Sequence, residues 1–320
     1  MEKYRLGIDV GGTKVLYGLL DETCEVKARL RTAMPEDVTP EQLTDKLERE
    51  ARILLSRQGV EPEQLTGIGV GMPSYVDFER GVVISSGSID RIRDYPARQL
   101  LEARFPGVKV LVDNDTNLAG LAEHRLGAGK GERHMLYTAL STGIGSGFII
   151  DGKLFRGSYG GAGESGHMLV TPGEGVLCGC GNRGCIMSYA SGLMVMRHVR
   201  RRMEQGQPTL MRDMAEDPRQ LTSRHLAEAA DKGDELALEM MDQMTTYIAV
   251  YLYNLFMAFN IRCNVCGGGL TNLGEPFFRA IRRKVDGFNH QEGQTIDIRP
   301  AQLGGDNGII GAAMLFEEGV

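Results

Sequence analysis

The fold prediction starts from the stretch Leu6-Gly-Ile-Asp9-Val-Gly11-Gly12-Thr13-Lys14-Val-Leu-Tyr-Gly-Leu-Leu20. Two apolar runs flank a glycine-rich turn, which is typical of a β-hairpin. The backbone N–H groups of such a turn can surround a phosphate, and Thr13 adds a hydroxyl donor. Asp9 ends the first strand beside the turn, where its carboxylate could hold Mg²⁺ directly or through water. The turn is not a Walker loop, because no Gly-Lys-Ser/Thr opens a helix there. For this segment alone, an ordinary hairpin is the alternative.

The same pattern returns later, as Leu136-Tyr-Thr-Ala-Leu-Ser-Thr142-Gly143-Ile-Gly145-Ser-Gly-Phe-Ile-Ile150. We interpret the two stretches as an internal duplication, with one hairpin in each of two domains. Two phosphate-binding turns that face each other would hold a nucleotide between them. A third glycine run, Gly267-Gly268-Gly269, follows a strand predicted at 261–266 and would allow the close approach of an adenosine.

Predicted strands and helices follow one another in the first half of the chain, and the part after the cysteine cluster is expected to be mainly helical. With 320 residues, two domains are expected. A capping box at Thr39 and Gln42, with Pro40 between them, predicts the first helix, and Gly59 is placed to end it. Further helices are expected at 97–104, 194–204, 223–231, 235–260 and 276–285 and after Gly304–Gly308. The segments 72–77 and 85–96 are expected to be loops.

One histidine and three cysteines cluster after the second hairpin, with the spacing His-x10-Cys-x-Cys-x4-Cys. The ligands would be His167, Cys178, Cys180 and Cys185. Four such ligands from one loop predict a tetrahedral Zn²⁺ site. Because no position stays open for a water nucleophile, the site is expected to be structural. Three free cysteines in a glycine-rich loop are the alternative.

Polar side chains at two further places could bind a polyol. Glu164 stands three residues before His167, so a single turn can direct both side chains to the same side of the loop. If zinc binds one ring nitrogen of His167, the other nitrogen stays available to bind a polar ligand. A solvated carboxylate is the alternative for Glu164. The run Asp113-Asn114-Asp115-Thr116-Asn117 follows a strand predicted at 108–112. Ligands collect at strand ends in α/β proteins, and a carboxylate there could accept a proton. The alternative is that Asp115 or Thr116 caps the next helix.

Composition excludes several classes of function. A formal charge of −6 argues against a general nucleic-acid binder, and no apolar run approaches the roughly 20 residues that span a bilayer. The chain enters its first strand without a signal-peptide pattern. Six cysteines, three of them clustered, suit a reducing cytoplasm. Cys263 and Cys266 are expected to be core thiols, and the apolar stripe of helix 235–260 could face the core or a second subunit.

Taken together, these motifs resemble the ROK family (repressors, open reading frames and sugar kinases) over nearly the whole chain. The resemblance rests on Asp9–Lys14, Asn114-Asp115, Gly163–His167, the cysteine cluster, Ser191-Gly192, Gly267–Gly269 and Gly304–Gly308. It implies an actin-like (ribonuclease-H-like) ATPase fold of two α/β domains flanking a cleft. Residues 1–114 plus about 302–320 would form the first domain, and 115–301 the second, with the zinc loop and dimerisation helices.

The resemblance also implies a function, that of a cytoplasmic, homodimeric, ATP-dependent sugar kinase similar to glucokinases, which phosphorylates a hexose or hexose derivative. Asp115 would be the general base, and Asp9 would position Mg²⁺ and the phosphates. ATP would be bound by Gly11, Gly12, Thr13, Lys14, Thr142, Gly143, Gly145, Gly267, Gly268 and Gly269. The sugar would be bound by Ser74, Asn114, Asp115, Glu164, His167 and Met187.

The sequence departs from the family at the expected sugar pocket. Met187 stands where the family has a sugar-contacting Glu, the segment Ile84–Ile89 lacks the usual Pro-Asn pair, and Met72-Pro73-Ser74 replaces a Gly-Pro-Gly-like loop. Losing a hydrogen-bonding carboxylate costs about 1–3 kcal/mol for a sugar that needs it. We therefore expect a different or modified hexose as the acceptor.

Two alternative functions stay open at this point. One is a kinase for an N-acyl amino sugar, a ketohexose or another polyol. The other is a non-catalytic sugar-binding regulator. Family repressors carry an additional N-terminal helix-turn-helix, and this chain begins its first strand at about residue 4, so DNA binding is not expected.

Overall fold

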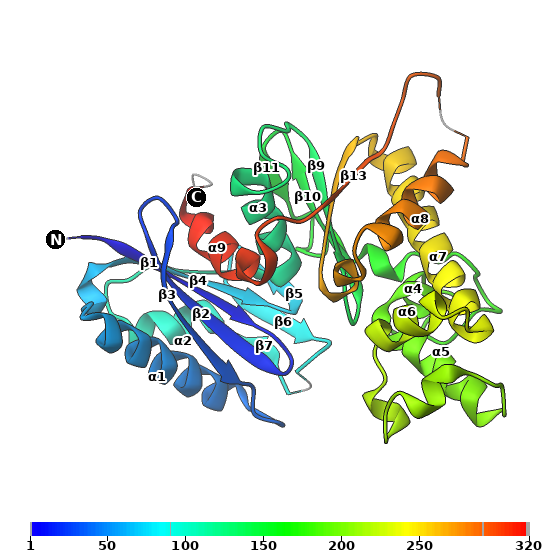
Figure 1. Ribbon diagram of the computed structural model, residues 1–320. Coiled ribbons are helices and arrows are strands. Elements are labelled where there is room, and N and C mark those ends of the chain that lie inside the picture. The colour runs from blue at the N-terminus through cyan, green and yellow to red at the C-terminus, as the bar shows by residue number, and fades with distance from the viewer. Residues whose placement is uncertain (1, 90, 290, 318–320) are drawn as a thin grey trace. The chain divides into compact units, whose positions relative to one another are not determined.

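A computed structural model describes residues 2–89, 91–289 and 291–317 (Figure 1). The chain forms two compact units, one of Met1–Arg133, Gly147–Ala162 and Gln302–Val320, the other of His134–Ser146 and Gly163–Ala301. The first unit therefore extends beyond the boundary expected at residue 114. The cause is helix α3 (Asp115–Leu126), which packs on α9 (Asn307–Met314) so closely that a Cβ on Gly311 would lie 1.9 Å from the Leu118 carbonyl oxygen.

The first unit is built on a five-stranded sheet of order β3-β2-β1-β4-β8. The strands are β1 (Tyr4–Val10), β2 (Lys14–Asp21), β3 (Val26–Ala33), β4 (Leu65–Met72) and β8 (Val110–Asn114). β1 and β2 pair antiparallel with Val10 opposite Val15, which confirms the first hairpin, whereas β1, β4 and β8 run parallel. Parallel strands end at one edge of a sheet, so the residues that follow β1, β4 and β8 come together there.

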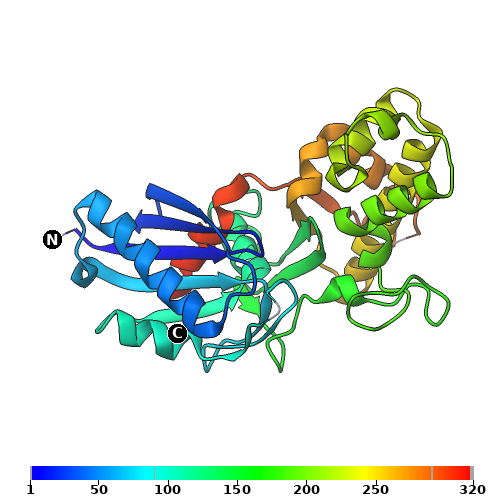
Figure 2. The same ribbon diagram turned by 90° about the horizontal axis from the view of Figure 1, so that it is seen from below.

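Helix α1 (Pro40–Gln58) lies along one face of this sheet (Figure 2), and an apolar core fills that side of the unit. The predicted capping box is present, since the Thr39 hydroxyl accepts from the backbone N–H of Gln42, and Gly59 ends the helix with a φ of 64°. Leu43 and Leu47 of α1 are fully buried and belong to the same apolar core as Leu6 of β1. Helix α2 (Ala97–Arg104) matches its prediction in both bounds.

The opposite face carries a row of three glycines in register across three strands, Gly18, Gly7 and Gly69, which we call the glycine row. Helix α9 lies on it. A Cβ on Gly7 would lie 2.0 Å from the Ile309 carbonyl oxygen, and one on Gly69 would lie 1.9 Å from that of Ala312. Three helical residues advance about 4.5 Å, close to the spacing of about 4.8 Å between strands. Successive turns of α9 therefore meet successive strands.

A small antiparallel sheet contradicts two loop predictions. It consists of β5 (Ser74–Asp77), β6 (Val82–Ser86) and β7 (Arg93–Tyr95). Segments 72–77 and 85–96 read as loops because they are short, polar and rich in proline, glycine and serine. Tertiary packing overrides these local preferences: Val76 and Tyr95 are buried.

The second sheet has the order β11-β10-β9-β12-β13. Its strands are β9 (Met135–Leu140), β10 (Ile144–Ile150), β11 (Lys153–Phe155), β12 (Cys263–Gly267) and β13 (Asp297–Pro300). β9 and β10 are neighbours, as the duplication predicts, although β10 already begins at Ile144, inside the expected loop. Strands β3, β11 and β13 were not predicted, because each is either partly exposed or very short.

Helices make up most of the rest of the second unit: α4 (Met187–Ala190), α5 (Gly192–Glu204), α6 (Ser223–Asp231), α7 (Glu235–Phe259) and α8 (Glu275–Asp286). The described residues include no helix with the length and hydropathy needed to cross a membrane. Cys263 and Cys266 are buried in β12, which confirms them as core thiols, and burial raises the pKa of Cys266 to about 12.

Candidate functional site

Asp9 lies at the end of β1, half-buried and opposite Gly71 of β4. Helix α9 backs it, since a Cβ on Gly308 would lie 2.6 Å from the carboxyl carbon of Asp9. Burial raises the pKa of Asp9 to about 6, although the Lys14 ammonium opposes the shift. The Asp9 carboxylate is therefore closely packed and partly shielded from water. Gly308 belongs to the motif Gly304–Gly308, but the sequence did not predict that it packs against Asp9.

The first hairpin turn is exposed at Gly12, Thr13 and Lys14, and the backbone N–H of Gly11 donates to the Lys14 carbonyl oxygen at 2.8 Å. A Cβ on Gly12 would lie 3.2 Å from the Ser88 carbonyl oxygen. Glycine at position 12 thus allows a close approach to the segment before β7. The turn presents backbone to solvent, as a phosphate site requires.

Asn114 and Asp115 join β8 to α3. The cap of α3 is Asn114, not Asp115 or Thr116 as considered above: its Oδ1 accepts from the backbone N–H groups of Thr116 at 2.8 Å and Asn117 at 3.2 Å. Asp115 Oδ1 accepts from Thr116 N–H at 2.7 Å. The Asp115 Cα lies 3.6 Å from where a Cβ on Gly71 would be, and Gly71 pairs with Asp9. The fold therefore brings Asp9 and Asp115 to the same edge of the sheet.

A buried ion pair supports this edge, and the sequence reading missed it. Arg156 Nε lies 2.8 Å from Asp113 Oδ2, while the Asn117 side chain donates to Asp113 Oδ1 at 3.0 Å. Burial raises the pKa of Asp113 against the opposing effect of Arg156. The Arg156 guanidinium also lies 3.8 Å from the centre of the Phe78 ring. Nothing local predicts this pairing, because 43 residues separate the two charges. The side chain of Ser74, an expected sugar ligand, lies outside the described part of the chain.

In the second unit, the four predicted metal ligands come together. The ligand atoms of His167, Cys178, Cys180 and Cys185 all lie within 4.8 Å of one another. Cys180 Sγ and Cys185 Sγ are 3.6 Å apart, and Cys178 Sγ is 3.5 Å from His167 Nδ1. Tetrahedral zinc with bonds of about 2.3 Å to sulfur and about 2.05 Å to nitrogen places S–S pairs about 3.8 Å and S–N pairs about 3.5 Å apart. The donor set therefore fits Zn²⁺, with Nδ1 as the histidine ligand.

The loop that carries Glu164 and His167 is fixed by a buried hydroxyl bridge. His167 Nε2, the nitrogen away from Cys178, lies 4.0 Å from Glu164 Oε2. Between them in sequence, the Ser165 hydroxyl meets the Tyr251 hydroxyl of α7 at 2.7 Å, and Tyr251 also meets Ser146 of β10. Burial raises the pKa of Tyr251 to about 12. Tyr251 thus ties the Glu164–His167 turn to β10 and α7.

The remaining expected nucleotide ligands also lie in the second unit. Thr142 is exposed, while Gly143 and Gly145 are half-buried, and a Cβ on Gly143 would lie 3.5 Å from the methyl group of Met187. Met187 therefore lies beside the second glycine turn. The other three expected ligands are Gly267, which ends β12, and the two residues after it. Cβ atoms on Gly267 and Gly268 would meet protein atoms at 2.2 Å and 2.5 Å, whereas one on Gly269 would meet none closer than 3.9 Å.

The chain matches the family described as "ROK family" over residues 5–319. It is 32% identical to a glucokinase of Streptomyces coelicolor, with 98% of this chain and 97% of that protein covered. It is 26% identical to a xylose repressor of Bacillus spizizenii, covering 98% of this chain and 77% of the repressor. A solved ROK family glucokinase from Streptomyces griseus, in complex with glucose and AMPPNP, is 31% identical with a TM-score of 0.82 and 98% of both chains covered. The chain has the actin-like ATPase fold of these kinases and belongs to the ROK family.

Proposed function

We propose that the protein is an ATP-dependent sugar kinase that transfers the γ-phosphoryl group of ATP to a hydroxyl of a hexose or hexose derivative. The observation that carries the proposal is the meeting of Asp9 and Asp115 at one sheet edge, beside the exposed turn Gly12–Lys14. Similarity to glucokinases over the full chain supports it. Phosphoryl transfer requires mainly positioning and charge stabilisation, which this edge can supply.

Asp115 acts as the general base. Thr116 donates to its Oδ1 from both the backbone N–H at 2.7 Å and the hydroxyl at 3.2 Å, so the carboxylate is held at the start of α3. From there it accepts the proton of the attacking sugar hydroxyl as the bond from that oxygen to the γ-phosphorus forms and the bond to the departing ADP breaks. Asn114, Glu164, His167, Met187 and Ser74 are the proposed sugar contacts.

Asp9 is the residue that would hold Mg²⁺, since a carboxylate at a phosphate-binding turn suits this hard cation. Bound Mg²⁺ would neutralise charge on the phosphates. The backbone N–H groups of Gly12 and Thr13, with Lys14, bind the phosphates, while the N–H of Gly11 closes the turn on the Lys14 carbonyl oxygen. Thr142, Gly143, Gly145 and Gly267–Gly269 are proposed for the remainder of ATP.

His167 and the three cysteines of the cluster would hold a structural Zn²⁺. Burial lowers the pKa of His167, which favours the neutral imidazole that a metal needs. With Nδ1 on the metal, Nε2 is directed toward Glu164 and can bind a sugar hydroxyl. We also propose a cytoplasmic homodimer. The dimer rests on the resemblance to the family.

A coupled assay of ADP formation, run over glucose, other hexoses, amino sugars, N-acyl amino sugars, ketohexoses and polyols, tests the proposal. The control is Asp115→Asn. Turnover of one sugar that disappears in Asp115→Asn is the expected result. ATP binding with no turnover of any sugar would overturn the kinase and favour a sugar-binding regulator. Turnover confined to an N-acyl sugar or a ketohexose would instead select the alternative acceptor.

A further inference from the structure

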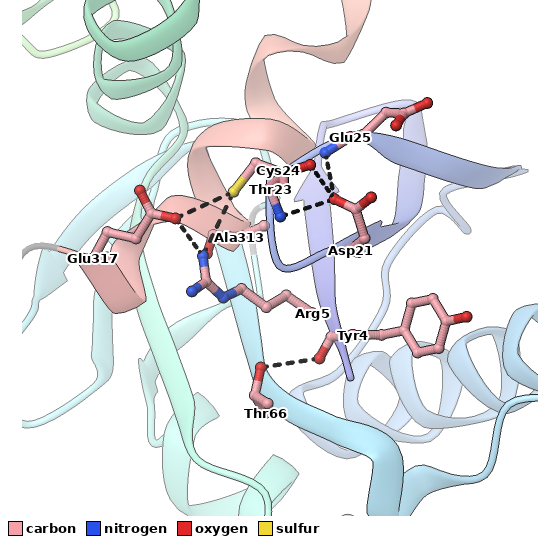
Figure 3. A network of polar contacts seen from close by, with 9 residues as sticks. All are labelled: Tyr4, Arg5, Asp21, Thr23, Cys24, Glu25, Thr66, Ala313 and Glu317. Atoms are coloured by element: carbon pink, nitrogen blue, oxygen red, sulfur yellow. Dashed lines mark hydrogen bonds and ion pairs between the residues drawn. The ribbon is translucent and has the colours of Figure 1, made fainter. Parts of the chain in front are cut away.

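An arginine at each end of helix α9 connects the helix to the first sheet. We call the Arg29–Asp306 contact the near anchor and the contacts of Arg5 with Ala313 and Glu317 the far anchor. At the start of α9, the guanidinium of Arg29 in β3 contacts both carboxylate oxygens of Asp306, with Nε 3.0 Å from Oδ1 and 3.1 Å from Oδ2. At its end, Arg5 of β1 donates to the Ala313 carbonyl oxygen at 3.4 Å and pairs with Glu317 at 2.6 Å (Figure 3). A planar guanidinium that meets both oxygens fixes direction as well as distance.

The far anchor includes a thiol. Figure 3 shows Cys24 Sγ between Arg5 and Glu317, 3.5 Å from a nitrogen of the first and 3.5 Å from an oxygen of the second. Burial raises the pKa of Cys24 to about 11, so the thiol is neutral at physiological pH. This end of α9 lies over the beginning of β1, four residues away from Asp9 along the strand.

The near anchor, in contrast, lies two residues from Gly308, which touches Asp9. The two glycines before Asp306 are loosely packed. Gly304 has a φ of 57°, and a Cβ on Gly304 or Gly305 would meet no atom within 4 Å. Glu123 holds residues 302 and 303 through their backbone N–H groups, but these two loosely packed glycines separate that contact from α9. The Arg29–Asp306 pair therefore holds the chain two residues before the place where α9 backs Asp9.

We propose that Arg29 is a positioning residue for Asp9, acting through Asp306 and Gly308. The inference rests on the role proposed for Asp9. Arg29 stands in register with the glycine row, opposite Gly18, so it sets where the first turn of α9 begins on the sheet. When the pair is lost, the first turn can lift and Gly308 no longer confines the Asp9 carboxylate. Displacements near 1 Å can cost up to about 100-fold in rate.

The test compares Arg29→Gln with Arg5→Gln, which removes an arginine–carboxylate pair from the same helix at the far end. We expect Arg29→Gln to lower kcat about tenfold and to leave the KM for sugar within about twofold. Arg5→Gln should lower the melting temperature at least as much and keep kcat within about twofold of the wild type. Exchanging the charges, Arg29→Asp with Asp306→Arg, should recover part of kcat. Equal losses of kcat in Arg29→Gln and Arg5→Gln, or none in Arg29→Gln, would overturn the proposal.

Hydrogen exchange separates this inference from the proposed function, because it needs no turnover. In ligand-free protein, amides of residues 306–311 should exchange faster in Arg29→Gln than in the wild type or in Arg5→Gln. If no sugar is phosphorylated by the wild type but exchange changes in this way, the kinase proposal fails and the mechanical link from Arg29 to α9 stands. Unchanged exchange at 306–311 refutes the link whatever the activity.

Discussion

Asp9 should make the protein less stable at neutral pH, and Asp9→Asn should remove that cost. Burial raises the pKa of Asp9 from its ordinary value of 3.8 to about 6. Between these values the native state holds a proton that the unfolded chain has lost, so the free energy of unfolding falls as pH rises. The pKa of Asp9 rises by about 2, and each pKa unit corresponds to about 1.36 kcal/mol, so the free energy of unfolding is lowered by about 3 kcal/mol at pH 7. An asparagine at position 9 is uncharged at every pH in this range, so it does not lower the free energy of unfolding in this way.

Urea unfolding of both proteins at pH 4 and pH 7 measures this effect. Asp9→Asn should exceed the wild type by about 2–3 kcal/mol at pH 7 and by much less at pH 4, where Asp9 is largely protonated in the native state. Both proteins carry the same cysteine cluster, so its acid sensitivity cancels in the difference. A variant no more stable than the wild type at pH 7, or a difference independent of pH, would refute the reasoning.

Asp21→Asn is a control with the opposite sign. Lys27, at 2.8 Å, and the hydroxyl of Thr23 hold the pKa of Asp21 well below its usual range, with further help from the backbone N–H groups of Glu25 and Thr23. Its charged form is therefore stabilised by folding. This variant should be less stable than the wild type at pH 7, and the difference should shrink as the pH falls toward the native-state pKa of Asp21.

Four further variants test separate parts of the molecule. Asp115→Asn should lower kcat about 1,000-fold with little change in the sugar Kd from calorimetry, and a modest loss would exclude a general base. Cys180→Ser should reduce bound zinc, measured by mass spectrometry, and also the melting temperature; undiminished zinc would count against the ligand set. Tyr251→Phe removes the bridge between Ser146 and Ser165, so the sugar KM should rise about tenfold at constant metal content. Glu123→Gln should lower unfolding free energy by about 2 kcal/mol, since its buried carboxylate accepts from Gln302 and Leu303, and unchanged urea unfolding would contradict this.

Local sequence patterns predicted those parts of the fold whose interactions are close in the chain. The first hairpin, the capping box of α1 and the bounds of α2 each depend on a few neighbouring residues, and all are confirmed. The metal cluster belongs to the same class, because its four ligands span only 19 residues and the glycines between them permit one compact loop. Segments 72–77 and 85–96 were predicted wrongly because their strands are stabilised by burial, which local composition does not reveal.

The tertiary structure alone decided which distant residues meet. Glycines 7, 18 and 69 appear in sequence as weak points of three strands, yet the register aligns them into a surface on which α9 lies. The same packing places Gly308 against Asp9 and Asp306 against Arg29, and it pairs Arg156 with Asp113. The sequence by itself determined which functional groups the protein has for a site, namely carboxylates, thiols, an imidazole and glycine-rich turns that can bind phosphate. Strand register and helix packing decided the geometry, because contacts between residues far apart in the chain form only when the whole unit is folded.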